Sequence, residues 1–442
     1  MKVFWFFFLK KNILLPLPLI APGSIGCPSH RAKDNYMLHN AKDSELRARA
    51  ARVVPGGMWG HQSAANLPEG YPQFFAGAQG CRIRDVDGNE YIDFMCSWGP
   101  VLLGHHHPEV EAAAARQAAQ GDCQNGPGEA MVELAELLVD TIPHADWVQF
   151  QKNGTDATTM AVTFARADTG RRKVLVAKGA YHGAIPWTSP SMNGVTNEDR
   201  AHIDHYIFND VASLEAAIDR HQGDLAAILV SAFKHDVGID QEMPTPAFAR
   251  RARDLCDATG AALIIDDVRA GFRLHLGGSW EGLGVRPDLA AWSKSIANGH
   301  PLAAITGNDR FRDAVRGTFS TGSFWTAAVP HAAGVATIRA LKRDDGIGHM
   351  TAMGTRFRTG MAALSARHSI PIRQSGPVQM PLVLFDDDAT LAKANTFCTA
   401  ALKAGAYFHP KHNMFLCTAH TVKDIDDALV AADAGFSAVA RL

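Results

Sequence analysis

Five short apolar runs of strand length alternate with helical segments in the middle of this chain. The runs are Val174–Ala177, Ala226–Val230, Ala262–Ile265, Leu289–Trp292 and Ala303–Thr306. Strands that are apolar throughout are typical of a mostly parallel sheet covered by helices on both faces. The helical pattern of Glu129–Ile142, and a second helix that is expected to stop at Gly260, fit between such strands. The pattern predicts a large α/β domain over residues 95–335.

The sequence on either side of this region lacks the regular alternation of apolar strands and helices. Arg82–Phe94 contains an Asp-Gly turn between alternating residues, which predicts a hairpin. Residues 37–94 are therefore expected to form the first part of a smaller domain. Residues 336–442 are expected to complete it as an α+β unit, with helices, apolar runs and a closing helix at Gly348–His368, Val378–Phe385, Met414–Ala419 and Val422–Ala440.

The first 36 residues contain two apolar runs, 3–9 and 13–21, which Lys10 and Lys11 separate. Neither half reaches the length of roughly 20 residues that spans a bilayer, so stable membrane insertion is not expected. We expect this extension to lie outside the folded core. A signal peptide and an organellar address are the alternatives.

Composition excludes several classes of protein. Hydrophobic residues make up 47% of the chain, charged residues 20%, and the net charge is −2, which is ordinary for a globular protein and attracts neither nucleic acid nor an anionic membrane. The seven cysteines include no Cys-x-x-Cys pair, so no metal site is expected. Unpaired cysteines favour a reducing compartment, and we expect the cytoplasm.

Two charged residues follow successive strands of the predicted sheet. Asp266 ends the run Leu263–Ile265, and Lys294 follows Leu289–Trp292. Taken singly, each could be a solvated side chain, or in the case of Asp266 a helix cap. Together, at the edge of the sheet where α/β ligands bind, they match the needs of pyridoxal phosphate. That cofactor requires a lysine for a Schiff base and a carboxylate for its pyridine nitrogen.

Two further motifs lie between these strands. Asn153-Gly154-Thr155 precedes the helix expected at Ala157–Ala167, where backbone N–H groups and a hydroxyl can bind a phosphate. Thr155 could instead be only an N-cap. Tyr181 in Tyr181-His182-Gly183 follows a strand and could stack on a flat cofactor, or be a half-buried core residue.

The order and spacing of these motifs resemble the class III branch of fold-type I pyridoxal-phosphate aminotransferases, and within it glutamate-1-semialdehyde 2,1-aminomutase. The resemblance runs from about residue 45 to 440. The motifs that carry it are Val54-Pro55-Gly56-Gly57, Cys96-Ser97-Trp98-Gly99-Pro100, Leu103-Gly104-His105-His106-His107-Pro108, Asn153-Gly154-Thr155, Tyr181-His182-Gly183, Asp266-Asp267-Val268 with Gly271-Phe272-Arg273, and Phe415-Leu416 with Ala419-His420-Thr421.

The resemblance implies a pyridoxal 5′-phosphate enzyme and assigns roles to individual residues. Lys294 would form the Schiff base and move a proton, and Asp266 would pair with the pyridinium nitrogen. Tyr181 and Val268 would enclose the ring, with Asn153, Gly154, Thr155 and His182 also in the cofactor site. In this family a residue of the neighbouring subunit also binds the phosphate, which implies a homodimer. Ser323 is favoured for that role, and Thr318 and Thr321 remain open.

Departures from the resemblance concern the substrate. Ser63 stands where the aminomutase has an arginine that clamps a carboxylate, and a hydroxyl does not replace a bidentate guanidinium. Arg269 and Arg373 are candidates for another carboxylate anchor. The candidate pocket residues are Trp59, His61, Trp98, Lys411 and His412.

We therefore expect an aminotransferase that moves an amino group between an amino acid or amine and a keto or aldehyde acceptor by a ping-pong mechanism. The alternatives are the aminomutase itself and a racemase-like or non-catalytic paralogue on the same fold.

Overall fold

A seven-stranded sheet forms the centre of the structure and confirms the predicted α/β class. The computed structural model describes residues 38–442, which form one compact unit, so the predicted extension 1–36 lies outside the described residues. The strand order is β4-β10-β9-β8-β7-β5-β6. The strands span β4 (Trp147–Gln151), β5 (Lys173–Ala177), β6 (Ile203–Tyr206), β7 (Leu225–Ser231), β8 (Ala262–Asp266), β9 (Leu289–Trp292) and β10 (Ala303–Gly307).

The sheet is mostly parallel, as its apolar strands indicate. Strands β9, β8, β7, β5 and β6 run parallel to one another, whereas β10 is antiparallel to both β9 and β4. Alternate residues enter two separate cores: Ile228 and Val230 of β7 face one, and Ala227 and Leu229 face the other. Both faces are therefore buried, which explains why these strands are apolar at every position.

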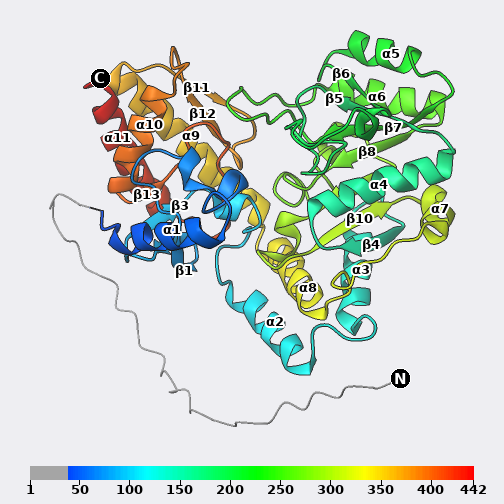
Figure 1. The fold of residues 1–442 in the computed structure, drawn as a ribbon, viewed down its shortest axis with the longest axis horizontal. Helices are drawn as coiled ribbons and strands as arrows, with labels where there is room; N and C mark the ends of the chain where they lie inside the picture. The colour runs from blue at the N-terminus through cyan, green and yellow to red at the C-terminus, as the bar shows by residue number, and fades with distance from the viewer. Residues whose placement is uncertain (1–37) are drawn as a thin grey trace, which may run out of the picture. The chain divides into compact units, whose positions relative to one another are not determined.

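Helices cover both faces of this sheet (Figure 1). Helix α4 contributes to one core, and α5 and α6 contribute to the other. Helix α8 runs through the predicted boundary at residue 335. The helices of this part of the chain are α2 (Pro108–Gln120), α3 (Glu129–Thr141), α4 (Gly154–Thr169), α5 (Val211–Asp219), α6 (Pro246–Thr259), α7 (Arg312–Gly317) and α8 (Ala328–Arg343).

A second sheet joins the two ends of the described chain. It has the order β1-β2-β3-β13, and the predicted hairpin is present as β2 antiparallel to β3. The late strand β13 pairs in parallel with the early strand β3. The bounds are β1 (Phe75–Gln79), β2 (Arg82–Asp85), β3 (Glu90–Asp93) and β13 (Ala406–Tyr407), and the preceding helix is α1 (Ala41–Val53).

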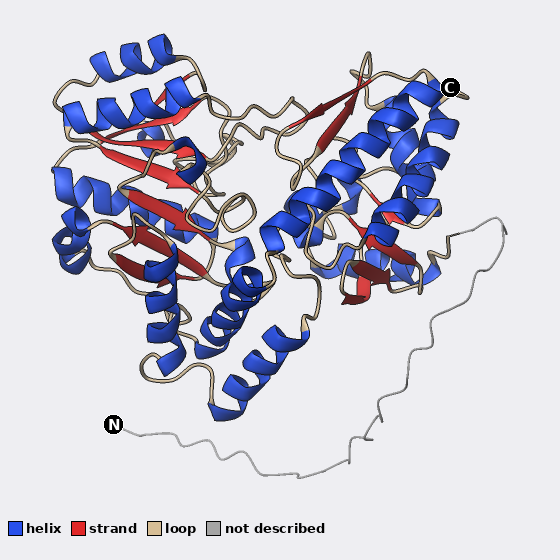
Figure 2. Cartoon of the chain, turned by 180° about the vertical axis from the view of Figure 1, so that it is seen from behind, coloured by secondary structure: helices blue, strands red, loops and turns tan. Residues whose placement is uncertain are grey.

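The remaining C-terminal elements pack around this second sheet. Helix α11 lies against α9 and α10 (Figure 2), and β11 pairs with β12. They span α9 (Gly346–His368), β11 (Ile372–Ser375), β12 (Leu382–Phe385), α10 (Ala392–Lys403) and α11 (Val422–Val439). The apolar run Met414–Ala419 is largely buried but is not a strand. Within residues 38–442, no helix combines the length and hydropathy that a membrane span requires.

Candidate active site

Lys294 follows β9 and begins a short 3-10 turn, Lys294–Ala297. Its φ of 48° is left-handed, a conformation that an ordinary side chain adopts at some cost. Its stem lies against Gly99, where an added Cβ would approach Lys294 Cδ to 3.2 Å. Burial, and next the positive charge of Arg269, lower the pKa of the Lys294 amine to about 7. A neutral amine is the nucleophilic form, so this lysine is prepared for attack on a carbonyl.

Asp266 ends β8, the strand beside β9, so that its charge reaches Lys294 across the same sheet edge. Its Oδ2 lies 2.7 Å from His182 Nδ1, and its Oδ1 accepts the N–H of Val268 at 3.1 Å. The other ring nitrogen of His182, Nε2, is buried and has no hydrogen-bond partner in the described chain. The two hydrogen bonds fix the direction in which the Asp266 carboxylate points.

The N-terminus of α4 lies close to Val268 and to the loop after β5. Asn153, not Thr155, is the N-cap: its side chain accepts the Asp156 N–H in a capping box. The N-cap interpretation of Thr155 is therefore wrong, because the helix begins three residues earlier than expected. The first-turn N–H groups of Gly154 and Thr155 have no intrahelical acceptor. A Cβ on Gly154 would lie 2.6 Å from Val268 Cγ1, so only glycine fits there.

Tyr181 and the residues after it complete this side of the site. The Tyr181 side chain is 44% exposed, which does not fit a core role. His182 is buried and its carbonyl accepts the Thr158 hydroxyl at 2.7 Å. The hydroxyl of Thr155 accepts the Ala184 N–H at 3.4 Å. The loop after β5 is thus tied to the first turn of α4.

Residues 318–324 form a loop that exposes two aromatic side chains. Phe319 is 90% exposed and Phe324 is 63% exposed. Ser323 and Thr321 are also exposed, whereas the Thr318 hydroxyl donates to the carbonyl of Ala314 at 2.7 Å. The Thr318 hydroxyl therefore already has an acceptor within its own chain.

Aromatic and histidine rings gather around Trp98. The ring centroids of His61, His409 and His412 lie 4.7, 5.4 and 5.1 Å from that of Trp98. Burial lowers the pKa of all three histidines, that of His409 to about 3. Arg269 and Lys294 lower the pKa of His61 and His412 further. The cluster is therefore uncharged at neutral pH and lies beside the lysine.

The five candidate pocket residues do not all lie in this cluster. His61, Trp98 and His412 are brought together, and Lys411 lies near His409, whose pKa its charge lowers. Trp59 is 68% exposed and makes no aromatic contact within residues 38–442. His409 was not singled out from the sequence, although it stands in the same run as His412.

Two buried polar residues that the sequence did not single out hold the loops around Lys294. Arg273 donates to the carbonyls of Gly99, Val101 and Leu416 at 2.5–2.7 Å. Asn298 accepts the N–H groups of Leu102 and Leu103 and donates to the carbonyl of Gly104. The only signal for these roles in the sequence was that Arg273 belongs to the motif Gly271-Phe272-Arg273. The three carbonyls that Arg273 contacts lie far from it in the sequence, so motif spacing could not indicate them.

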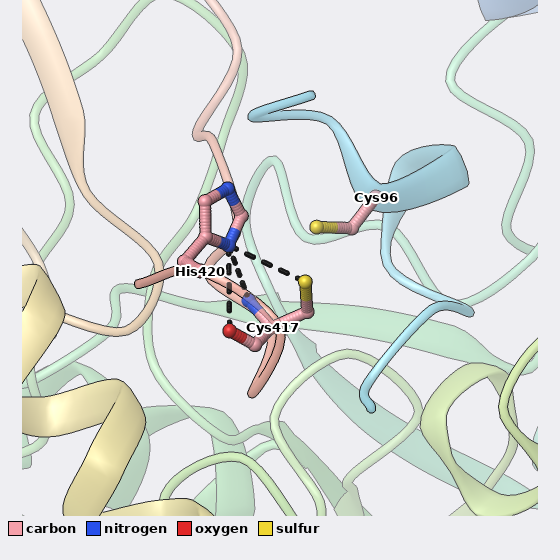
Figure 3. A group of neighbouring side chains, drawn as sticks. All are labelled: Cys96, Cys417 and His420. Carbon is pink, nitrogen blue, oxygen red and sulfur yellow. Dashed lines mark hydrogen bonds between the residues drawn. The ribbon is translucent and has the colours of Figure 1, made fainter. Parts of the chain in front are cut away.

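A buried cluster of Cys96, Cys417 and His420 lies where the turn Cys96–Trp98 meets the C-terminal segment (Figure 3). Their ligand-type atoms lie within 4.8 Å of one another. Nδ1 of His420 accepts the Cys417 N–H at 3.1 Å and lies 3.3 Å from its sulfur, and the Cys96 thiol donates to the Phe415 carbonyl. These internal hydrogen bonds hold the turn Cys96–Trp98, whose three residues all have positive φ, against the C-terminal segment.

Comparison with known proteins decides the family. The model of class-III aminotransferases matches residues 66–432. The chain belongs to the class-III aminotransferases. An aminopentol aminotransferase of Sphingopyxis macrogoltabida is 48% identical over 405 residues, which cover 92% of this chain and 96% of that protein. A 3-aminobutyryl-CoA aminotransferase of Cloacimonas acidaminovorans is 32% identical, over 88% and 95% of the two chains.

Solved structures agree with this assignment. The PLP internal aldimine form of the FumI protein of Sphingopyxis sp. MTA144 has a TM-score of 0.89 and 49% identity, covering 90% of this chain and 96% of that one. A transaminase with PLP bound has a TM-score of 0.84 and 27% identity, covering 92% and 99%. The resemblance stated from the sequence is confirmed, and the chain is a PLP-dependent aminotransferase.

The residues present fit pyridoxal phosphate. At the start of α4, Gly154 lies so close to the Val268 side chain that there is no room for a Cβ, and the first-turn N–H groups beside it are suited to a phosphate. The Asp266 carboxylate, held by His182, is the group that a pyridinium nitrogen requires, and Lys294 supplies an amine of lowered pKa. The aminotransferase cofactor thus matches the donor set of this site.

Proposed function

We propose that Lys294 binds the cofactor as a Schiff base and carries the proton in each half of a ping-pong amino transfer. The observation that carries this proposal is the lowered pKa of Lys294, about 7, at the same sheet edge as Asp266. An amine that is neutral near pH 7 can both attack a carbonyl and accept a proton. When bound, pyridoxal phosphate withdraws electrons from the amine-bearing carbon and makes its C–H acidic.

The other cofactor residues have complementary roles in this proposal. Asp266, oriented by His182, would keep the ring nitrogen protonated. Val268 and Tyr181 would enclose the two faces of the ring. The first-turn N–H groups of Gly154 and Thr155 and the Thr155 hydroxyl would bind the phosphate at the positive end of α4, where Asn153 is the N-cap.

A homodimer would complete the phosphate site with Ser323 of the second copy. Phe319 and Phe324, both strongly exposed beside Ser323, support this, because a second subunit would bury them. Thr321 is the alternative donor, whereas the Thr318 hydroxyl already donates within its own chain.

We also propose that the protein is cytoplasmic, since all six described cysteines are unpaired thiols.

For the amino donor we propose a primary amine on a neutral, hydroxyl-rich chain, as in the name aminopentol. The rings of His61, Trp98 and His412 support this, because uncharged imidazoles and an indole can pack against such a chain and bond to its hydroxyls. Ser63, buried where an arginine clamp stands in the aminomutase, argues against glutamate semialdehyde.

Spectroscopy and a donor screen test the proposal. The full chain loaded with pyridoxal phosphate should absorb visible light, and borohydride should bleach it and fix the cofactor on Lys294 in a peptide map. Lys294→Ala should lose this link, whereas the surface variant Lys423→Ala should keep it. An amino-polyol and an alkylamine should then be compared with glutamate 1-semialdehyde. Cofactor fixed at another lysine, or turnover of the semialdehyde alone, would overturn the proposal.

A further inference from the structure

Arg269 lies beside the reactive lysine with most of its hydrogen-bonding capacity unused. Its Nη1 donates to Asn413 Oδ1 at 2.6 Å, and within residues 38–442 this is its one hydrogen bond. No carboxylate of the described chain forms an ion pair with it. Arg269 is partly buried, and burial lowers the pKa of its guanidinium to about 10, so it is still charged at neutral pH. A guanidinium has five N–H donors, which leaves four available here.

Two other arginines have the partners that Arg269 lacks. Arg273 is buried and donates to three backbone carbonyls. Arg373, the other candidate carboxylate anchor, is exposed and paired with Asp240 and Asp386. Arg269 has neither arrangement. Its side chain is only partly buried and has one hydrogen bond, so an external anion can reach its free N–H groups and balance its charge.

The groups around Arg269 define where that anion would bind. Its charge lowers the pKa of Lys294 and of the three histidines His61, His235 and His412, so it lies close to the lysine and to these histidines. The same histidines are neutral because burial lowers their pKa values, and they supply no negative charge.

Two carboxylates, Asp266 and Asp236, interact electrostatically with Arg269 but form no ion pair with it. Asp266 is held by His182 and by the Val268 N–H. Asp236, whose own pKa is raised by burial, lies against Gly179, where an added Cβ would approach its Oδ2 to 2.9 Å. Neither carboxylate therefore satisfies the four free N–H groups.

We infer that Arg269 binds the carboxylate of a 2-oxo acid acceptor, and of the α-amino acid formed from it. A planar guanidinium binds a carboxylate through two parallel hydrogen bonds. The inference rests on the proposed function, because Lys294 marks the substrate carbon that exchanges oxygen for nitrogen. A guanidinium next to that lysine suits a carboxylate on the adjacent carbon. Arg269, which follows β8, would thus replace the carboxylate-binding arginine that is absent at Ser63.

Acceptor selectivity tests this inference in the holoenzyme. The pyridoxamine form of the wild type, Arg269→Met and Arg373→Met would be mixed with pyruvate or with propanal, which lacks the carboxylate. For Arg269→Met we expect kcat/KM for pyruvate to fall about 100-fold, the loss of a bidentate charged pair, mostly through KM. The preference for pyruvate over propanal should fall at least about 10-fold. Arg373→Met should match the wild type with both acceptors.

Binding without chemistry provides a second readout. Calorimetric titration of the holoenzyme with propionate should show binding that Arg269→Met weakens about 10-fold or more and Arg269→Lys restores in part. Equal losses with both acceptors, or an altered visible spectrum with unchanged propionate binding, would mean that Arg269 serves the cofactor and would overturn the inference. A wild type that reacts with neither acceptor would instead contradict the proposed function.

Discussion

His182 Nδ1 lies 2.7 Å from Asp266 Oδ2, and this contact joins the loop after β5 to the end of β8. His182 is buried, and its second ring nitrogen has no partner in the described part of the chain. The histidine therefore touches the carboxylate with one nitrogen and is held in place by packing. Its role in the proposed site is to orient Asp266.

The first prediction concerns this contact. His182→Leu should weaken cofactor binding about 10- to 100-fold, because a hydrogen bond to a charged group contributes roughly 1.5–3 kcal/mol. Fluorescence titration of the apoprotein with pyridoxal phosphate would measure the change. His221 forms a comparable pair at 2.8 Å with Asp204, which lies on the edge strand β6. His221→Leu should bind the cofactor like the wild type, and equal losses in both variants would contradict the assigned role.

The second prediction tests the close contact between Gly154 and Val268 at the start of α4. Gly154→Ala would place a Cβ 2.6 Å from Val268 Cγ1 and 2.9 Å from Cγ2, so Val268 must move. We expect a loss of about 1–3 kcal/mol in cofactor binding, the usual cost of overpacking. Gly282→Ala is the control, because nothing lies within 4 Å of its added methyl group. Equilibrium dialysis of both variants should separate them clearly.

The third prediction concerns Arg273. Arg273→Met would leave the carbonyls of Gly99, Val101 and Leu416 buried without a donor, which should cost about 3 kcal/mol or more in the free energy of unfolding. Urea unfolding followed by circular dichroism would measure it. Arg343 makes ion pairs with Glu109 and Asp344 at the surface, and Arg343→Met should unfold close to the wild type. Similar midpoints for the two variants would refute this account.

The fourth prediction is a pH dependence in the cofactor-free protein. The pKa of Lys294 is about 7, so acylation of its amine should reach half its maximal rate near pH 7. Ordinary lysines become reactive only near their pKa of about 10.4. Mass spectrometry of the labelled peptide gives the profile. Removing the positive charge in Arg269→Met should shift the midpoint to higher pH, and a midpoint above 9 in the wild type would show that Lys294 is not desolvated.

The fifth prediction concerns Asp267, the buried neighbour of Asp266. Burial raises the pKa of its carboxyl from 3.8 to about 6. The folded state then holds the proton that the unfolded state releases between pH 4 and 6. Its contribution to stability is full below pH 4 and is lost as the pH rises through 6. Asp267→Asn should remove this fall from a plot of unfolding free energy against pH, and an unchanged plot would count against the assignment.

Much of the fold could be predicted from the sequence because its central strands are buried on both faces. The runs that became β5, β7, β8, β9 and β10 are apolar at nearly every position. Strands β4 and β6 were not predicted, because each lies at an edge of the sheet and contains polar residues: Gln149 and Gln151 in β4, Asp204 and His205 in β6. Edge strands lack the signal that the central strands carry.

The site could be predicted only in part. The ends of two adjacent parallel strands place Asp266 and Lys294 together, as expected. Motif order alone could not distinguish Arg269 from Arg373, since only the folded chain shows which guanidinium is already paired. It also could not show that Trp59 is exposed. The roles assigned to individual cofactor residues stay predictions until the experiments above are done.

The parallel pairing of β13 with β3 has a consequence for synthesis of the protein. Phe415 donates its N–H to the Phe94 carbonyl and Arg273 reaches the Leu416 carbonyl, so loops around Lys294 need residues near the end of the chain. A chain still being translated can form the central sheet but not these contacts. The surroundings of Lys294 can therefore be completed only after residue 416 has left the ribosome, so formation of the site depends on the C-terminal part of the chain.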